Sequence, residues 1–163
     1  MHAHQTSDRL RKLGVPHAVC GGVAVGVLGY PRATRDVAFL LGRQAEDPSN
    51  SHGFSAEVMA LYNKDVIHLV LVRRTEPEQG LLLHALQRQT PVATTIPVVG
   101  PLELVWLKLS TPDYRREHDD NDIRQLLRVG AIDAAEVLDW LELHDPYKAQ
   151  DFAELVQDAT QRP

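Results

Sequence analysis

The sequence contains a single cysteine, Cys20, in 163 residues. No disulfide can therefore form within the chain, and a zinc site built from cysteine thiolates is excluded. Long apolar runs are also missing, because the longest one, between Val66 and Val72, is interrupted by His68 and is far too short to cross a bilayer. The first residues show no apolar segment followed by a small-residue cleavage site. We therefore expect a cytoplasmic protein in a reducing compartment, without a membrane partner.

Repeats and low-complexity segments are lacking as well, since the ten glycines and ten prolines are scattered without a period. Apolar residues make up 44% of the chain and charged residues 24%, as in ordinary globular proteins. A length of 163 residues corresponds to about one domain. We expect residues 1–163 to form a single domain, with an α/β core over about residues 1–100 and a helical portion over residues 101–163.

A net positive charge is confined to the first part of the chain. Residues 1–43 carry six basic and two acidic side chains, whereas residues 101–163 carry seven basic and fourteen acidic ones. This asymmetry disfavours a general nucleic-acid-binding protein, which needs one broad positive face. It is compatible with a small anionic ligand near the front of the chain, and equally with a solvated surface of uneven charge.

The hydrophobic pattern predicts an α+β fold, with a small mixed β-sheet and flanking helices followed by a helical portion. The expected strands are residues 15–20, 35–41 and 92–99, with a hairpin whose arms are residues 54–62 and 65–73. The expected helices are one capped at Thr6–Asp8 and ending at Gly14, a short one over residues 23–28, one opening at Pro77, one starting at Pro101, and three from Asp119 onward.

The most informative segment follows the first predicted strand. Gly21 and Gly22 separate that strand from a short helix, so free backbone N–H groups at the helix start can hold a phosphate. A glycine pair alone is explained equally well by tight packing. Arg32, Thr34 and Asp36 follow at a spacing that makes the pattern more specific.

With these residues the sequence resembles the nucleotidyltransferase superfamily that has a polymerase-β-like core, and most of all its minimal and AbiEii-type toxin-associated branches. Their pattern is a glycine pair after the first strand, then His-Gly-x-x-Arg-x-Thr-x-Asp-x-Asp. Gly29, Arg32, Thr34 and Asp36 match it in register. Downstream, the Lys-Leu, Arg and Lys-Asp-x-x-Asp features of those proteins resemble, in this chain, Lys108, Arg116, Asp119 and Asp122. The resemblance implies a nucleotidyltransferase-like fold, in a toxin–antitoxin or regulatory context.

The departures from that pattern concern the acids. The family places two acids at alternating positions of one strand, where they point the same way, and a third on a neighbouring strand. Together the three hold two Mg²⁺ ions on the nucleotide phosphates. In this chain only Asp36 is retained, because the second position is Ala38 and the third is His68. Asp65 lies on the opposite strand face, if the strand is regular, and Asp47 in a loop, so neither replaces them.

Three hypotheses follow. In the first, the protein is nucleotidyltransferase-like but inactive or strongly impaired, and retains at most a nucleotide- or phosphate-binding cleft. In the second, it is a divergent active enzyme that uses Asp36 with Mg²⁺ and borrowed acids, and transfers a nucleoside monophosphate from a nucleoside triphosphate to RNA, protein or a small acceptor. In the third, it is an interaction module or homodimer, whose acidic helices present Trp106, Trp140 and Phe152 to a partner. No cofactor is assigned outside the second hypothesis.

The first hypothesis assigns phosphate binding to basic side chains that pair with phosphate without a metal. Each assignment has an ordinary structural alternative. Arg32 and Arg35 also suit surface ion pairs, including pairs with Asp36, and Lys108 also suits a solvated helix face. Asp119 and Asp122 lie one helical turn apart, so they can orient Arg116 or Lys108. The expected phosphate-binding residues are Gly21, Gly22, Arg32, Thr34, Arg35 and Lys108.

Overall fold

The computed structural model describes residues 2–51, 53–63, 65–71, 80, 96–111 and 113–161. The chain divides into two compact units. The first, here called the sheet unit, comprises Met1–Ala24 and Ala33–Val99; the second, the helical unit, comprises Val25–Arg32 and Gly100–Pro163. The short segment 25–32 therefore leaves the first part of the sequence to join the C-terminal helices.

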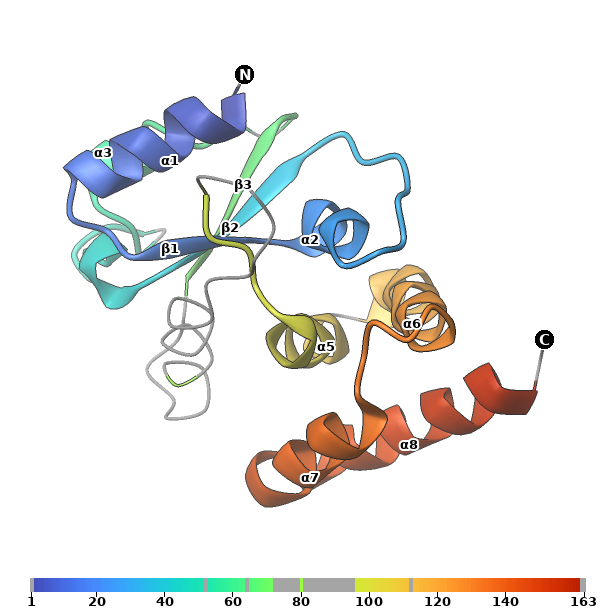
Figure 1. Ribbon diagram of the computed structural model, residues 1–163. Helices are drawn as coiled ribbons and strands as arrows, with labels where there is room; N and C mark the ends of the chain where they lie inside the picture. The colour runs from blue at the N-terminus through green and yellow to red at the C-terminus, as the bar shows by residue number, and fades with distance from the viewer. Residues whose placement is uncertain are drawn as a thin grey trace. The chain divides into compact units, whose positions relative to one another are not determined.

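Among its described residues, the sheet unit contains three strands in the order β1-β2-β3 (Figure 1). β1 and β2 are antiparallel, while β2 and β3 are parallel, so the sheet is mixed as expected. Val19 of β1 also forms a parallel bridge to Val98. The strands are β1 His17–Cys20, β2 Val37–Leu41 and β3 Ile67–Leu71, and the helices are α1 His2–Lys12 and α3 Ala56–Met59, with a 3₁₀ turn at Arg43–Ala45.

Helix α1 ends where its sequence changes from helix-forming residues to glycine. Gly14 has φ +68°, the left-handed conformation that glycine adopts without strain. The N–H of Val15 donates to the carbonyl of Leu10, and that of Gly14 to the carbonyl of Arg11, which is the Schellman pattern. The chain then enters β1, all four residues of which are buried.

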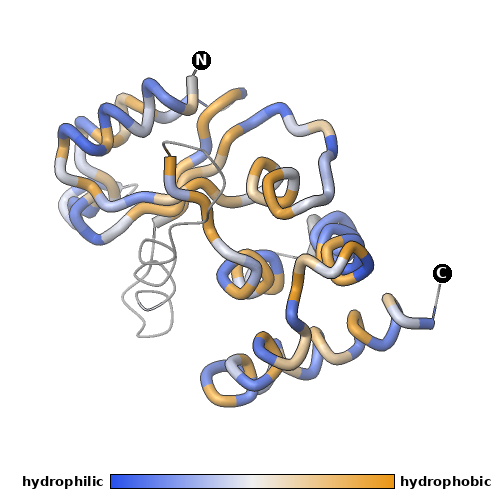
Figure 2. Tube along the Cα trace, viewed as in Figure 1, coloured by the Kyte–Doolittle hydropathy of each residue, from blue (hydrophilic) through white to orange (hydrophobic). Residues whose placement is uncertain are grey.

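Helix α2, Gly21–Val27, starts in the sheet unit and ends in the helical unit. The other helices of the second unit are α5 Pro101–Leu109, α6 Asp113–Arg128, α7 Ala134–His144 and α8 Pro146–Gln161. Orange and blue alternate along α7 and α8 in Figure 2, as expected for helices with one buried face. Phe152 and Leu141 are fully or almost fully buried in this unit, so the predicted apolar stripes do form its core.

The α+β class is confirmed, but several local predictions are wrong. Residues 54–62 are not a hairpin arm: Ser55 accepts a hydrogen bond from the N–H of Val58 and caps the short helix α3. Consequently β3 pairs in parallel with β2 instead of closing a hairpin. Thr6 and Ser7 do not cap α1, which begins at His2 and buries both of them.

Two further predictions concern ends of elements. Helix α6 begins at Asp113, six residues before the expected start at Asp119, so the acids from Asp119 to Asp122 lie within the helix. The predicted helix opening at Pro77 lies outside the described residues except for Gly80, and of the predicted strand at 92–99 only residues 96–99 are described. Among the described residues, no helix is both long enough and apolar enough to cross a membrane.

Candidate functional site

The turn between β1 and α2 has the geometry that the glycine pair predicts. Gly21 has φ +65°, which side chains rarely adopt, and a Cβ at this position would lie 3.3 Å from the Cβ of Ala38. Gly22 follows in the first turn of α2. The strand–glycine–helix arrangement is therefore present, with β2 packed closely against the turn.

Asp36 and His68 meet beside this turn. His68 Nδ1 lies 2.8 Å from Asp36 Oδ2, and the Thr34 hydroxyl donates to Asp36 Oδ1 at 3.1 Å. Ala38 is the register partner of His68 on β3 and of Cys20 on β1. The carboxylate of Asp36 is thus held by His68 and Thr34.

The family resemblance implies acids at the positions of Ala38 and His68. The strand register makes these two residues direct neighbours. At the three positions where the resemblance implies acids, the chain carries one carboxylate, one methyl group and one imidazole. Mg²⁺ takes oxygen ligands, commonly carboxylates. Among the described residues no group of three or more His, Cys, Asp or Glu side chains could hold a metal ion. This donor set does not fit a pair of Mg²⁺ ions.

The acids considered as substitutes, Asp47 and Asp65, differ in their contacts. Asp47 accepts hydrogen bonds from the backbone and hydroxyl of Ser49 and from the Asn50 amide. The hydrogen bond from the Ser49 side chain lowers the pKa of Asp47. Asp65 is exposed, and its N–H donates to Asn63 Oδ1. Both side chains belong to turns of the sheet unit.

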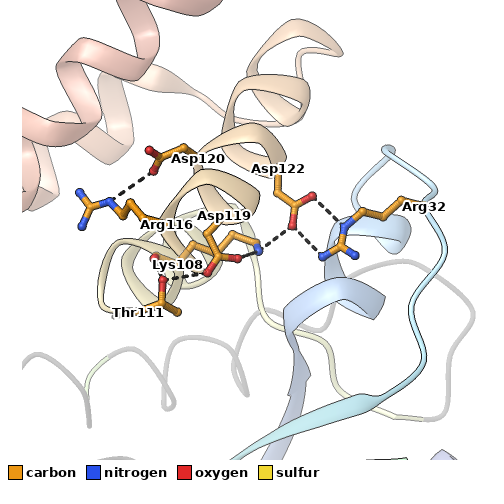
Figure 3. A network of polar contacts seen from close by, with 7 residues as sticks. All are labelled: Arg32, Lys108, Thr111, Arg116, Asp119, Asp120 and Asp122. Atoms are coloured by element: carbon orange, nitrogen blue, oxygen red, sulfur yellow. Dashed lines mark hydrogen bonds and ion pairs between the residues drawn. The ribbon is translucent and has the colours of Figure 1, made fainter. Parts of the chain in front are cut away.

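In the helical unit, Asp122 is the centre of a buried ionic network (Figure 3). Its side chain is only 1% exposed and accepts two hydrogen bonds from the Arg32 guanidinium, each 2.8 Å long. Lys108 Nζ donates to Asp122 at 2.7 Å and also to Asp119. The Thr111 hydroxyl donates to Asp119 at 2.8 Å. Two cations and two carboxylates therefore neutralise each other within this network.

The network changes the interpretation of the two strongest phosphate-binding candidates. Lys108 is 4% exposed, so the alternative of a solvated helix face is wrong. Arg32 does form an ion pair, but with a buried carboxylate of α6 and not on the surface. A phosphate would have to compete with Asp122 for both cations. Arg35, in contrast, is exposed and forms no ion pair with the part of the chain that the structure describes.

Arg116 contacts acidic side chains of two helices. It lies 3.4 Å from Asp120 and also contacts Asp151 of α8, so it joins two helices (Figure 3 shows the first contact). Burial raises the pKa of Asp120, an effect that the neighbouring Arg116 and Arg124 oppose. Of the two side chains that Asp119 and Asp122 were expected to orient, the structure places only Lys108 between them.

One buried polar pair was missed by the sequence reasoning. His17 of β1 is 5% exposed, and its Nδ1 and Nε2 lie 2.8 Å from the Val15 carbonyl and 2.7 Å from the Ser7 hydroxyl. Burial lowers the pKa of His17. The available signal was a histidine at an inward-facing position of an otherwise apolar strand, which requires buried hydrogen-bond partners.

The aromatic side chains proposed as a partner surface are mostly internal. Phe152 is fully buried, Trp106 is 8% exposed, and Trp140 is half-buried with its ring 4.5 Å from that of His144. Trp106 and Phe152 are therefore core residues and do not form an exposed partner surface.

Comparison of the sequence with models of known protein families finds none that matches, and comparison with curated proteins finds no relative.

Proposed function

We propose that this chain is a nucleotidyltransferase-like protein in which metal-dependent nucleotidyl transfer is lost or strongly impaired. The observation that carries the proposal is the pairing of Ala38 with His68 on adjacent strands, next to Asp36. The resemblance calls for carboxylates at both positions. A strand, a glycine turn and a short helix precede them, which supports the proposal.

Without divalent ions, the negative charge that develops on the phosphates during transfer is not stabilised, and the reaction slows. Two divalent ions stabilise the charge that develops on the phosphates by several kcal/mol. Each 1.36 kcal/mol corresponds to a factor of ten in rate, so loss of both ions slows transfer by several powers of ten. Asp36 alone, with one oxygen bonded to Thr34 and the other beside His68, does not replace three carboxylates.

A phosphate ligand at this nucleotidyltransferase-like site is expected to bind weakly. Arg32 and Lys108, the two cations that the resemblance assigns to phosphate, already share Asp122. Arg35 is the exposed cation nearest to Asp36 in sequence. Binding of ATP, GTP, CTP and UTP should therefore depend little on Mg²⁺, because no carboxylate cluster holds the ion.

Restoring the acids tests the proposal. The double variant Ala38→Asp with His68→Asp places two carboxylates beside Asp36, and Ala56→Asp adds one at an exposed position of the same unit as a matched control. We expect Mn²⁺ affinity, measured from the electron paramagnetic resonance signal of free Mn²⁺, to rise about tenfold or more in the double variant only. Equal Mn²⁺ affinity in all three proteins contradicts the proposed site.

Activity is tested separately with labelled nucleoside triphosphates and tRNA, protein or small acceptors. The wild-type chain should transfer no label above background. Transfer by the wild type that disappears in Asp36→Ala would establish the divergent active enzyme instead.

A further inference from the structure

A cavity of about 590 Å³ lies in the sheet unit. One wall is helix α1, and the other is formed by residues 60–63 and 66–67, which connect α3 to β3. This volume falls within the range of pockets that hold small organic ligands. None of Gly21, Asp36 or Ala38 lines it.

The wall contributed by α1 carries excess positive charge. Gln5, Asp8, Arg9 and Lys12 follow the i, i+3, i+4, i+7 spacing, so they share one face of the helix, and all four line the cavity. The Asp8 carboxylate accepts a hydrogen bond from Arg11 at 2.7 Å, which offsets its charge. Arg9 and Lys12 are exposed, and neither forms an ion pair with any residue that the structure describes.

The opposite wall combines apolar and aromatic surface. Leu61, Val66 and Ile67 supply aliphatic side chains, and Tyr62 supplies a ring that is 46% exposed. Tyr62 also stacks on His68, with ring centroids 6.4 Å apart and an angle of 28° between the planes. Tyr62 therefore separates the cavity from the Asp36–His68 pair by a single aromatic ring.

We propose that this cavity binds a small organic phosphate monoester, with the phosphate at Arg9 and Lys12 and an aromatic or aliphatic body against Tyr62 and Leu61. Two adjacent cations favour a dianion over a singly charged carboxylate. The apolar wall favours a ligand with a hydrophobic body over inorganic phosphate. The site is separate from the proposed nucleotidyltransferase-like site and does not depend on it.

Phenyl phosphate is the probe, with inorganic phosphate, phenol and benzoate as partial ligands, and binding is measured by titration calorimetry. Phenyl phosphate should bind more tightly than each of the other three. The double variant Arg9→Gln with Lys12→Gln should weaken phenyl phosphate binding about tenfold, because it removes two exposed ion pairs with the phosphate. Arg43→Gln, which removes one exposed cation elsewhere in the same unit, should leave its affinity unchanged, and Asp8→Asn should raise it.

The variants change exposed side chains, so each should keep the wild-type melting temperature within a few degrees, which circular dichroism checks. A second readout is the His68 ring resonance in NMR spectra, which should shift on addition of phenyl phosphate because Tyr62 stacks on that ring. The same titration on Asp36→Ala should show wild-type affinity. Phenyl phosphate affinity that is equal in wild type and Arg9→Gln/Lys12→Gln, or absent at millimolar concentration, overturns the proposal. Affinity lost in Asp36→Ala alone would assign the ligand to the other site.

Discussion

Replacing Asp122 by alanine removes the carboxylate on which two cations converge. Three hydrogen bonds are lost, two from Arg32 and one from Lys108. Lys108 stays buried with Asp119 as its remaining anion, while Arg32, 30% exposed, regains contact with water. Breaking a buried ion pair from one side costs about 3–5 kcal/mol. Because one cation keeps a partner and the other is partly solvated, we expect a loss of about 3 kcal/mol.

That loss is large against a total stability of about 5–15 kcal/mol. Unfolding in urea followed by tryptophan fluorescence measures it, since both tryptophans of the chain, Trp106 and Trp140, belong to the helical unit. The control is Asp158→Ala, which removes a carboxylate that is 46% exposed and 3.3 Å from Arg124. An exposed pair of this kind contributes about 0–1 kcal/mol.

Equal free energies of unfolding for Asp122→Ala and Asp158→Ala would refute the reasoning. Arg32 and Lys108 would then not be held by Asp122, and their assignment as phosphate-binding residues would regain support. A double-mutant cycle with Lys108→Met separates the two outcomes, because a real pair gives a coupling energy of at least about 0.5 kcal/mol.

Two other predictions concern the sheet unit. Gly21→Ala should cost more than Gly14→Ala: both pay about 1–2 kcal/mol for positive φ, but only the first brings a Cβ to 3.3 Å from Ala38. The difference, measured by urea unfolding with circular dichroism, should vanish in an Ala38→Gly background, and its persistence there would contradict the contact. The pKa of His17 is lowered from 6.5 in the folded chain, so on acidification the unfolded chain binds a proton at this side chain first. The contribution of His17 to stability is therefore full above pH 6.5 and declines as the pH falls below 6.5. The pH slope of unfolding between 7.5 and 5.5 should flatten in His17→Gln; an unchanged slope would assign the dependence to another group.

The elements that the sequence predicted well are those with a local cause. β1, the glycine turn and α2 follow from a short apolar run next to Gly21, and Gly14 ends α1 through its own backbone conformation. The apolar positions around Phe152 likewise predict α8, because a helical stripe is read within one segment. The strand that carries His68 does lie beside the strand that carries Ala38, because the two residues are partners in the sheet.

The failures have a different origin. Residues 56–59 alternate like a strand, yet the Ser55 cap makes them helical, and nothing in the local pattern shows that β3 will pair in parallel. Arg32 and Asp122 are 90 positions apart, so no spacing rule connects them. Lys108, in an otherwise apolar helix, signals a buried cation that needs an anion, but the sequence does not say which anion.

Under the proposed function, the absence of two acids and the pairing of two cations both weaken phosphate binding. Three acids would attract divalent ions, and those ions would in turn attract a triphosphate. Without those acids, Arg32 and Lys108 would still attract a phosphate if they were unpaired. Asp122 and Asp119 remove that attraction within the helical unit by pairing with both cations. An anionic ligand is then left with exposed cations such as Arg9, Lys12 and Arg35, which is why the charge on α1 matters more here than the resemblance alone would indicate.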